Sequence, residues 1–535
     1  MKPVAAAAAL AAALVCYAAV TTADSDNQAV GSSWWRRVSA LADDAMEGRQ
    51  TGTPGHTRAA DYVTRSFQAV GLEPAGTDGF IQRVGFRTRT IDEPRSSVSF
   101  VRDGRTRSIT LGVEATISMR ADPAPRVAAP LVFVGRALRV PDRRVDDLGA
   151  LDLRGAIAVY FTTTPDSLDA AARAQSASTA ERWRTLREAG AIGTITIANP
   201  HAAETPWARS SAQRLQPYIS LADAALDEFR EQQIAITMNP AHAELLFEGS
   251  GRTFAELVAL DEAGKPLGSF PLPTRVEATV AAARSEVESE NVAGVLRGRE
   301  PSLRDEFVVV SAHLDHLGVS PIGSGDRIYN GAMDNASGVA AILEAASLIH
   351  QSSERPARSI LFLAVTGEEH GELGSRYFVV HPTVPRSSIV ANLNTDMFLP
   401  LFPLRQLMAL GLEESDLALD VRAVGRRFGV GVQADPEPGR NRFARSDQYS
   451  FVRAGIPALG LKVGYDPDSA EAETVRVWMA DRYHGVSDDL SQPVNIEAAG
   501  LFVRALEALT LHVANRPDRP AWNERSRFKR LAARP

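Results

Sequence analysis

The chain has 535 residues, 44% of them hydrophobic and 23% charged, a composition typical of a globular protein with length for two or three domains. Its formal net charge of −7 argues against a nucleic-acid partner, because proteins of that class usually present a basic surface. Function must therefore be sought in particular residues, since bulk charge points to no partner.

The first 23 residues have the pattern of an export signal. One lysine precedes a run of alanine, valine and leucine that is too short for a good membrane span, and Thr21, Thr22 and Ala23 offer small side chains for cleavage. A retained amino-terminal anchor is the alternative. The single cysteine, Cys16, lies in this segment, so the mature chain would contain no disulfide. We expect a secreted or periplasmic protein without a stable membrane span after cleavage.

Residues 34–90 predict two helices. Apolar side chains recur at helical spacing on both sides of a link, residues 48–55, that is rich in glycine and contains a proline. The link needs no role beyond forming turns. His56, just after it, is expected at a helix start or on the surface.

The character of the chain changes between residues 130 and 270. Two apolar strands, PLVFVGRAL and DLRGAIAVYF, are followed by an alanine-rich helix and a third strand, GTITIANP. This order predicts a β-rich unit inserted into a larger domain.

The stretch from 307 to 338 combines a strand end with a helix start. Apolar residues 307–310 predict a buried strand, His313 and Asp315 follow where it would leave the sheet, and a glycine-rich loop leads to Asp334 at the entrance of a helix. A His-x-Asp sequence after a strand is common in proteins, so this stretch alone indicates little.

Two further strands end in acidic residues. Residues 360–365 precede Glu368 and Glu369, and a later strand ends at Asp396, while His484 opens a loop. In open α/β sheets, ligands bind beyond the carboxyl ends of the strands. Several carboxylates meeting there would repel one another, and two divalent cations would remove that repulsion.

This set, in its order, residue types and strand-end positions, resembles the zinc aminopeptidases of peptidase family M28, whose members use two zinc ions. The resemblance covers roughly residues 35–515. It implies the metal ligands His313, Asp334, Glu369, Asp396 and His484. It further implies Asp334 as the bridging ligand, Glu368 as general base and Asp315 beside His313. Gln448 departs from the histidine that relatives commonly have.

Physical chemistry supports these residue types. Zinc binds imidazole nitrogen and carboxylate oxygen, and few protein ligands leave room for water. Two dications, three ligand carboxylates and one hydroxide sum to zero charge, which leaves Glu368 to accept a proton from water. Asp315 is expected to accept the second N–H of His313 and fix its tautomer. His316 is a further candidate for contact with the site.

The predicted fold is α/β, with a mixed β-sheet sandwiched by helices of the zinc-dependent exopeptidase type. Apolar spacing predicts helices at 416–428 and 495–514, and the basic, proline-containing end is expected to be poorly ordered. The predicted division is a signal peptide (1–23), the first part of a catalytic domain (34–129), an insert resembling the protease-associated domain (130–270), the second part of the catalytic domain (271–515) and a basic tail (516–535).

The predicted function is an exported metallopeptidase with two Zn²⁺ per chain that releases amino-terminal residues from peptides. A carboxypeptidase or another amide hydrolase remains an alternative, because zinc chemistry does not decide which end of the substrate is bound. A binding module without metal is a second alternative, although the complete ligand set argues against it. The sequence does not indicate an oligomeric state.

Overall fold

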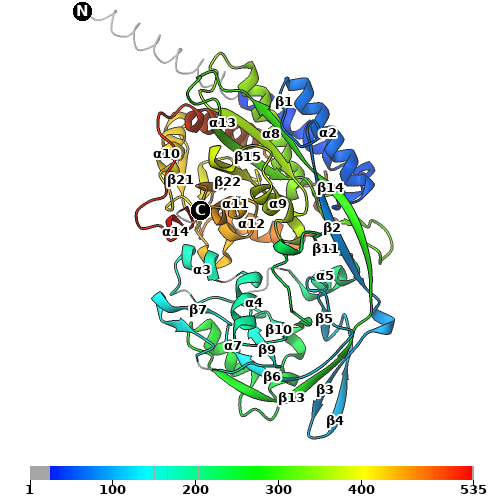
Figure 1. The fold of residues 1–535 in the computed structure, drawn as a ribbon. Coiled ribbons are helices and arrows are strands. Elements are labelled where there is room, and N and C mark those ends of the chain that lie inside the picture. Colours follow the sequence, from blue (N-terminus) through cyan, green and yellow to red (C-terminus); the bar gives the residue numbers. More distant parts are fainter. Residues whose placement is uncertain (1–24, 150, 166, 177, 202–204, 533–535) are drawn as a thin grey trace, which may run out of the picture.

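The computed structural model describes residues 25–532 except positions 150, 166, 177 and 202–204. The predicted signal peptide, 1–23, lies outside the described residues. Figure 1 shows a main domain and an insert below it, connected along one edge by the long strands β2 and β14. The main domain therefore has its sheet interrupted in sequence by the insert.

A mixed sheet forms the centre of the main domain. Its order is β11-β2-β14-β18-β15-β19-β22-β20-β21, with β1 paired to β14. The strands are β1 (Glu73–Pro74), β2 (Ile81–Ile91), β11 (Tyr218–Leu221), β14 (Ala282–Leu296), β15 (Phe307–His313), β18 (Ser359–Val365), β19 (Ile389–Thr395), β20 (Gln406–Leu410), β21 (Gly431–Gln433) and β22 (Ala458–Val463). The four central strands, β18, β15, β19 and β22, run parallel. Every residue of β15, β18 and β19 is buried, which explains their continuous apolar runs.

Helices cover both faces of this sheet, as predicted. On one face, α2, α8, α10 and α13 contact one another; on the other, α9 and α11 pack together, and α11 contacts β19 and β22. The helices are a segment at 25–41, α2 (Pro54–Val70), α8 (Ser337–Gln351), α9 (Leu373–Val380), α10 (Leu417–Phe428), α11 (Gln448–Arg453), α12 (Ala470–Asp481) and α13 (Ile496–Ala514). None of the described helices has both the length and the apolar character needed to cross a membrane.

The insert has its own sheet, in the order β4-β3-β13-β6-β9-β10-β12-β5. Its strands are β3 (Ser97–Arg102), β4 (Arg105–Ile109), β5 (Ala115–Ile117), β6 (Arg126–Val134), β9 (Ile157–Phe161), β10 (Gly193–Ile197), β12 (Ile234–Met238) and β13 (Ser269–Thr279). Its helices are α3 (Ala170–Ser176), α4 (Thr179–Glu188), α5 (Trp207–Ala212), α6 (Glu244–Phe247) and α7 (Phe254–Glu262). Short hairpins pair β7 (Arg139–Val140) with β8 (Val145–Asp146), and β16 (Gly318–Val319) with β17 (Ile328–Tyr329) in the main domain.

The second sheet extends beyond the predicted limits of 130 and 270 at both ends. Strand β4 is exposed along most of its length, so it lacks the apolar run by which the other strands of the insert were recognised. Strand β11, by contrast, lies inside the predicted insert but pairs with β2 of the main sheet.

The carboxyl-terminal tail is packed against the main domain, so the expectation of poor order was wrong. Phe528 is fully buried, with its ring 5.8 Å from the centre of Phe443, and α14 (Lys529–Ala532) follows it. Arg516 forms ion pairs of 2.7 and 2.9 Å with Asp416 and Asp420. The sequence feature that could have predicted this packing is the presence of two large aromatic residues, Trp522 and Phe528, in an otherwise basic segment.

Candidate metal centre

The parallel strands bring their polar ends to one edge of the sheet. His313 is the last residue of β15, Asp396 follows β19, and Glu369 lies in the turn η8 (Glu368–His370) after β18. Asp334 lies in the irregular turn η7 (Ala332–Ala336) that leads into α8, and His484 follows α12. The structure thus brings together all five predicted ligands.

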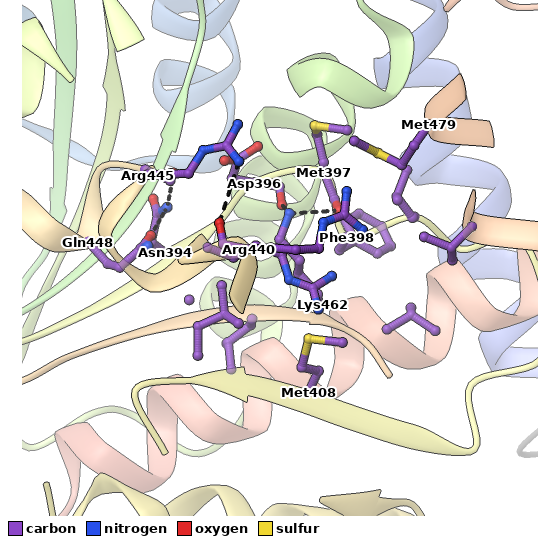
Figure 2. A pocket seen from close by; sticks show the side chains of 18 of the residues that line it. Asn394, Asp396, Met397, Phe398, Met408, Arg440, Arg445, Gln448, Lys462 and Met479 are labelled. Carbon is purple, nitrogen blue, oxygen red and sulfur yellow. Dashed lines mark hydrogen bonds between the residues drawn. The ribbon is translucent and has the colours of Figure 1, made fainter. Parts of the chain in front are cut away.

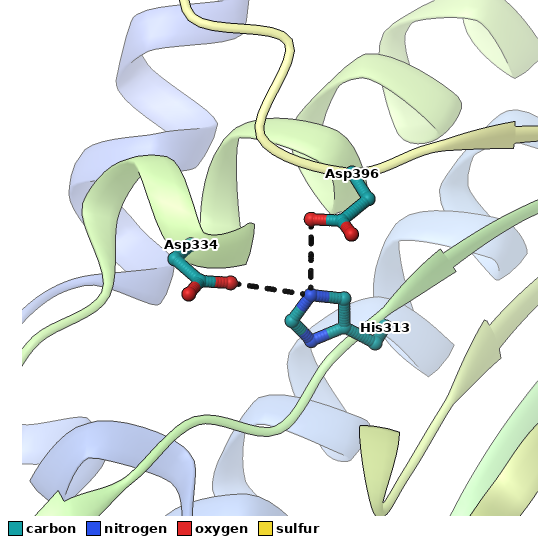
Figure 3. Close-up of side chains that lie close together, drawn as sticks. All are labelled: His313, Asp334 and Asp396. Atoms are coloured by element: carbon teal, nitrogen blue, oxygen red, sulfur yellow. Dashed lines mark hydrogen bonds and ion pairs between the residues drawn. The ribbon is translucent and has the colours of Figure 1, made fainter. Parts of the chain in front are cut away.

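The first half of the site consists of His313, Asp334 and Asp396, shown in Figure 3. The Nε2 atom of His313 lies 3.3 Å from Asp334 Oδ1 and 3.4 Å from Asp396 Oδ1. His313 and Asp334 are almost completely buried. Three ligand atoms of the types that zinc binds therefore surround one position.

The second half uses the other oxygen of Asp334. His484 Nε2 lies 3.3 Å from Asp334 Oδ2 and 3.2 Å from Glu369 Oε2. One carboxylate therefore offers one oxygen to each histidine, the arrangement required of a bridging ligand.

These separations fit a pair of zinc ions. Ligand atoms about 2.0–2.1 Å from a tetrahedral zinc ion are separated by about 3.3 Å, which matches the distances in both halves. Burial opposes a charge on His484, yet the carboxylates of Glu369 and Asp334 raise the pKa of His484 to about 10. The site is therefore strongly attractive to positive charge, and divalent ions would satisfy it better than protons.

Glu368 precedes the ligand Glu369 and is only partly exposed. Burial, opposed by His313, together with the carboxylates of Asp396 and Glu369 raises the pKa of Glu368 well above its usual value. A carboxylate with raised proton affinity beside two metal positions is suited to accept a proton.

Asp315 has a different contact from the predicted one. The nearest atom of Asp315 to His313 Nδ1 is its main-chain oxygen, at 3.2 Å, whereas its Oδ1 is 3.9 Å away. The carboxylate instead accepts the backbone N–H groups of Glu368 and Glu369, at 3.1 and 3.4 Å. These two donors lie at the start of a short helical turn, where they need an external acceptor. Asp315 therefore orients the acidic turn, and the tautomer of His313 is fixed by a carbonyl.

Two other side chains support the ligands. His316 is buried, and its Nδ1 lies 2.6 Å from Glu369 Oε1, the oxygen that faces away from His484. Asp488 accepts the backbone N–H groups of Met333 and Asp334, both at 3.0 Å, and so helps to hold the turn that carries Asp334.

Sequence reasoning missed Arg49. This arginine is fully buried and donates to the main-chain oxygens of Leu41, Leu314, Asn330 and Gly331. It thereby joins the loop after His313 to the loop before Asp334. Arg49 lies in a segment with Gly48 and Gly52 that reads as a surface turn, so no sequence pattern indicates its burial. His56 is fully buried in the first turn of α2, so of its two expected positions, helix start and surface, the structure shows the helix start.

A cavity of about 90 Å³ opens beside Asp396, as Figure 2 shows. Its apolar lining includes Met397, Phe398, Met408 and Met479, and its cationic lining includes Lys462. Gln448 is 1% exposed; its amide N–H₂ donates to the oxygen of Phe443 at 2.8 Å and its oxygen accepts from Asn394, also at 2.8 Å. Gln448 therefore forms part of the wall through internal hydrogen bonds.

The sequence profile described as peptidase family M28 matches residues 291–509, a span that contains all five ligands. Residues 291–509 are therefore similar to the peptidases of family M28. Among curated proteins, leupeptin-inactivating enzyme 1 of Streptomyces exfoliatus is 30% identical over 176 residues, which are 31% of this chain and 38% of that enzyme. The aminopeptidase NAALADL1 of Mus musculus is 33% identical over 119 residues, which are 21% of this chain and 14% of that protein.

The structural similarity extends beyond the matched span. The solved aminopeptidase from Aneurinibacillus sp. strain AM-1 superposes with a TM-score of 0.55 over 92% of this chain and 97% of that one, at 18% identity. The structural match therefore includes the insert as well as residues 291–509, and it supports the predicted mixed α/β fold. The chain matches only 38% and 14% of the length of these two curated relatives.

Proposed function

We propose that the protein is a two-zinc exopeptidase that removes amino-terminal residues from peptides. The observation that carries the proposal is Asp334, whose two oxygens each lie 3.3 Å from a different histidine. Two of the similar proteins are named as aminopeptidases, which favours this direction of cleavage.

The residues divide the work as follows. His313 and Asp396 would hold one ion, Glu369 and His484 would hold the other, and Asp334 would serve both. The ions, when bound, would polarise the peptide carbonyl and make water more acidic. Glu368 accepts the proton of the attacking water and passes it to the leaving amine. Asp315 and His316 keep Glu368 and Glu369 in position from either side of the turn.

The cavity beside Asp396 is suited to the side chain of the released residue, because it adjoins the first half of the site and has apolar walls. Its rim also includes Arg440, Arg442 and Arg445. A cationic rim would equally suit a terminal carboxylate, so a carboxypeptidase is the second candidate.

The test compares peptides with free and with blocked amino termini. An aminopeptidase releases amino acids only from the free form, whereas a carboxypeptidase cleaves both. Glu368→Gln should retain two zinc ions per chain while kcat falls by about 10³-fold or more, a general-base effect combined with loss of water positioning. Activity retained in this variant would remove Glu368 from its role, and no release from any peptide by zinc-loaded protein would favour a binding module.

We also propose that the protein acts outside the cytoplasm after loss of residues 1–23, and that the insert is of the protease-associated type. The first proposal is supported by the amino-terminal pattern and the second by the position of the insert between β2 and β14. Amino-terminal sequencing of protein recovered from the periplasm or the medium tests the first, and a chain that still begins at Met1 would contradict it.

A further inference from the structure

One segment of the insert returns to the main domain and passes beside the proposed metal site. We call residues 207–221 the strap; it contains α5, the turn η4 (Gln213–Leu215) and β11. At its start, Trp207 Nε1 donates to the oxygen of Gly112 in the insert, at 3.0 Å. At its end, β11 pairs with β2 of the main sheet. The strap therefore connects the two domains.

Arg209 connects the strap to the loop of a metal ligand. Its guanidinium donates to the main-chain oxygen of Tyr483 at 2.8 Å, and to those of Ala480 and Asp481 at 2.9 and 3.4 Å. The last carbonyls of an α-helix have no partner within the helix, and Arg209 supplies one for the end of α12. Tyr483 is the residue immediately before His484.

The backbone of His484 needs such support. Its φ of 53° lies in the left-handed region, which is unfavourable for a residue other than glycine. The ring of Tyr483 stacks on the imidazole of His484 with centres 3.9 Å apart. Fixing the carbonyl of Tyr483 therefore also fixes the orientation of the ligand ring.

Tyr218 connects the same strap to the other ligand loop of the second half-site. Its hydroxyl donates to the oxygen of His370 at 2.9 Å, and its ring meets the His370 ring edge-on, with centres 5.1 Å apart. His370 directly follows the ligand Glu369. The guanidinium of Arg120, from the insert, lies 5.8 Å from the centre of the Tyr218 ring and helps to hold it.

We propose that the strap positions the second half of the metal site, with Arg209 and Tyr218 as positioning residues for the ion held by Glu369 and His484. This inference rests on the proposed two-metal function. The strap contributes no ligand. It acts by holding the carbonyl groups of Tyr483 and His370, which are the chain neighbours of the ligands His484 and Glu369. The insert thereby controls the affinity for one of the two ions.

The test measures zinc affinity by calorimetry and zinc per chain after dialysis against a weak chelator. Arg209→Met keeps most of the side-chain stem and removes the donors. We expect it to retain the first ion with unchanged affinity and to bind the second about 10-fold to 100-fold more weakly, the range found when supports of metal ligands are removed. Tyr218→Phe, which removes one hydroxyl, should change the affinity in the same direction by less.

Arg214→Met is the matched control, because Arg214 lies on the same strap but bonds Glu93, at 2.6 and 2.9 Å, and no ligand loop. It should bind both ions as the unmodified chain does. Combined with His484→Ala, Arg209→Met should cause no additional loss of zinc affinity, because the ligand that it positions is gone.

The proposal would be overturned if Arg209→Met bound each ion with the same affinity as the unmodified chain does. It would also be overturned if Arg209→Met bound both ions more weakly by the same factor. If Arg209→Met fails to fold, a Tyr218→Phe protein that binds both ions normally overturns it instead. An unmodified chain that holds only one ion would contradict the two-metal function itself, and the role of the strap with it.

Discussion

The two halves of the metal site are built in different ways. His313 and Asp396 lie at the ends of β15 and β19, neighbouring parallel strands whose residues are all buried. Glu369 and His484 lie on loops, and the carbonyl groups beside them accept hydrogen bonds from the insert. A ligand on a buried strand end is positioned by the sheet, whereas a ligand on a loop depends on contacts from elsewhere in the chain.

The first half also has a support, but it comes from the amino-terminal segment. Arg49 binds the carbonyls of Leu314 and Gly331, next to His313 and upstream of Asp334. One arginine from the amino-terminal segment and one from the insert thus serve different halves of the site. Segments that contribute no ligand help to determine where the ligands lie.

Asp334 is the only ligand that the two halves share in the proposed site, and removing it should produce the largest effect. Asp334→Ala is expected to lose both ions and to lower kcat by more than about 10³-fold, because both ions would lack a charged ligand. Asp396→Ala should weaken the first ion more than the second. Zinc per chain and peptide turnover check both variants.

Retention of one tightly bound ion by Asp334→Ala would mean that the halves are independent. Loss of both ions from Asp396→Ala would mean that the two halves of the site are coupled more strongly than the one shared ligand, Asp334, explains. Either result would contradict the description of the site as two half-sites that share only Asp334.

Arg49→Met should destabilise the protein by about 3–5 kcal/mol, because it leaves several buried carbonyl oxygens without donors. Urea unfolding of the zinc-loaded protein measures this loss. Arg58→Met is the control, since the side chain of Arg58 is 42% exposed and its ion pair with Glu47 lies at the surface, so its loss should change the free energy of unfolding by less than about 1 kcal/mol.

If Arg49→Met is less stable and also binds the first ion more weakly, then Arg49 supports the first half-site as the strap is proposed to support the second. Equal stability of Arg49→Met and Arg58→Met would show that water replaces the lost donors.

The sequence could predict the central strands, because apolar runs mark buried parallel strands, and it placed His313, Glu369 and Asp396 near the ends of those strands. Asp334 and His484 lie on loops beside helices, and they were chosen through the resemblance to family M28. The sequence could not predict the direction of the Asp315 carboxylate, since two residues beyond His313 either the carboxylate or the main-chain oxygen can reach the ring. Arg49 and Arg209 bind main-chain oxygens far away in sequence, which no local pattern records. The same holds for Phe528, whose burial depends on a surface formed by distant residues.

The smallest predicted effect concerns Asp447 and the pH dependence of the free energy of unfolding. Asp447 is fully buried, and burial raises the pKa of its carboxyl group to about 7. In the unfolded chain this pKa is about 3.9. Between these values the folded protein retains a proton that the unfolded chain has released, so the free energy of unfolding falls as the pH rises.

Asp447→Asn removes this titration while nearly preserving shape. Between pH 5 and pH 8, the unmodified protein should lose about 2–3 kcal/mol more of its free energy of unfolding than the variant, with zinc saturating in both. Asp305→Asn, at an exposed position, should show no such difference. Parallel pH profiles for the unmodified protein and Asp447→Asn would mean that Asp447 is ionised at pH 5 despite its burial. The positive charge of the ion proposed for the first half-site would then stabilise the ionised carboxylate of Asp447. That half-site would depend on side chains other than its ligands, as the second half-site does.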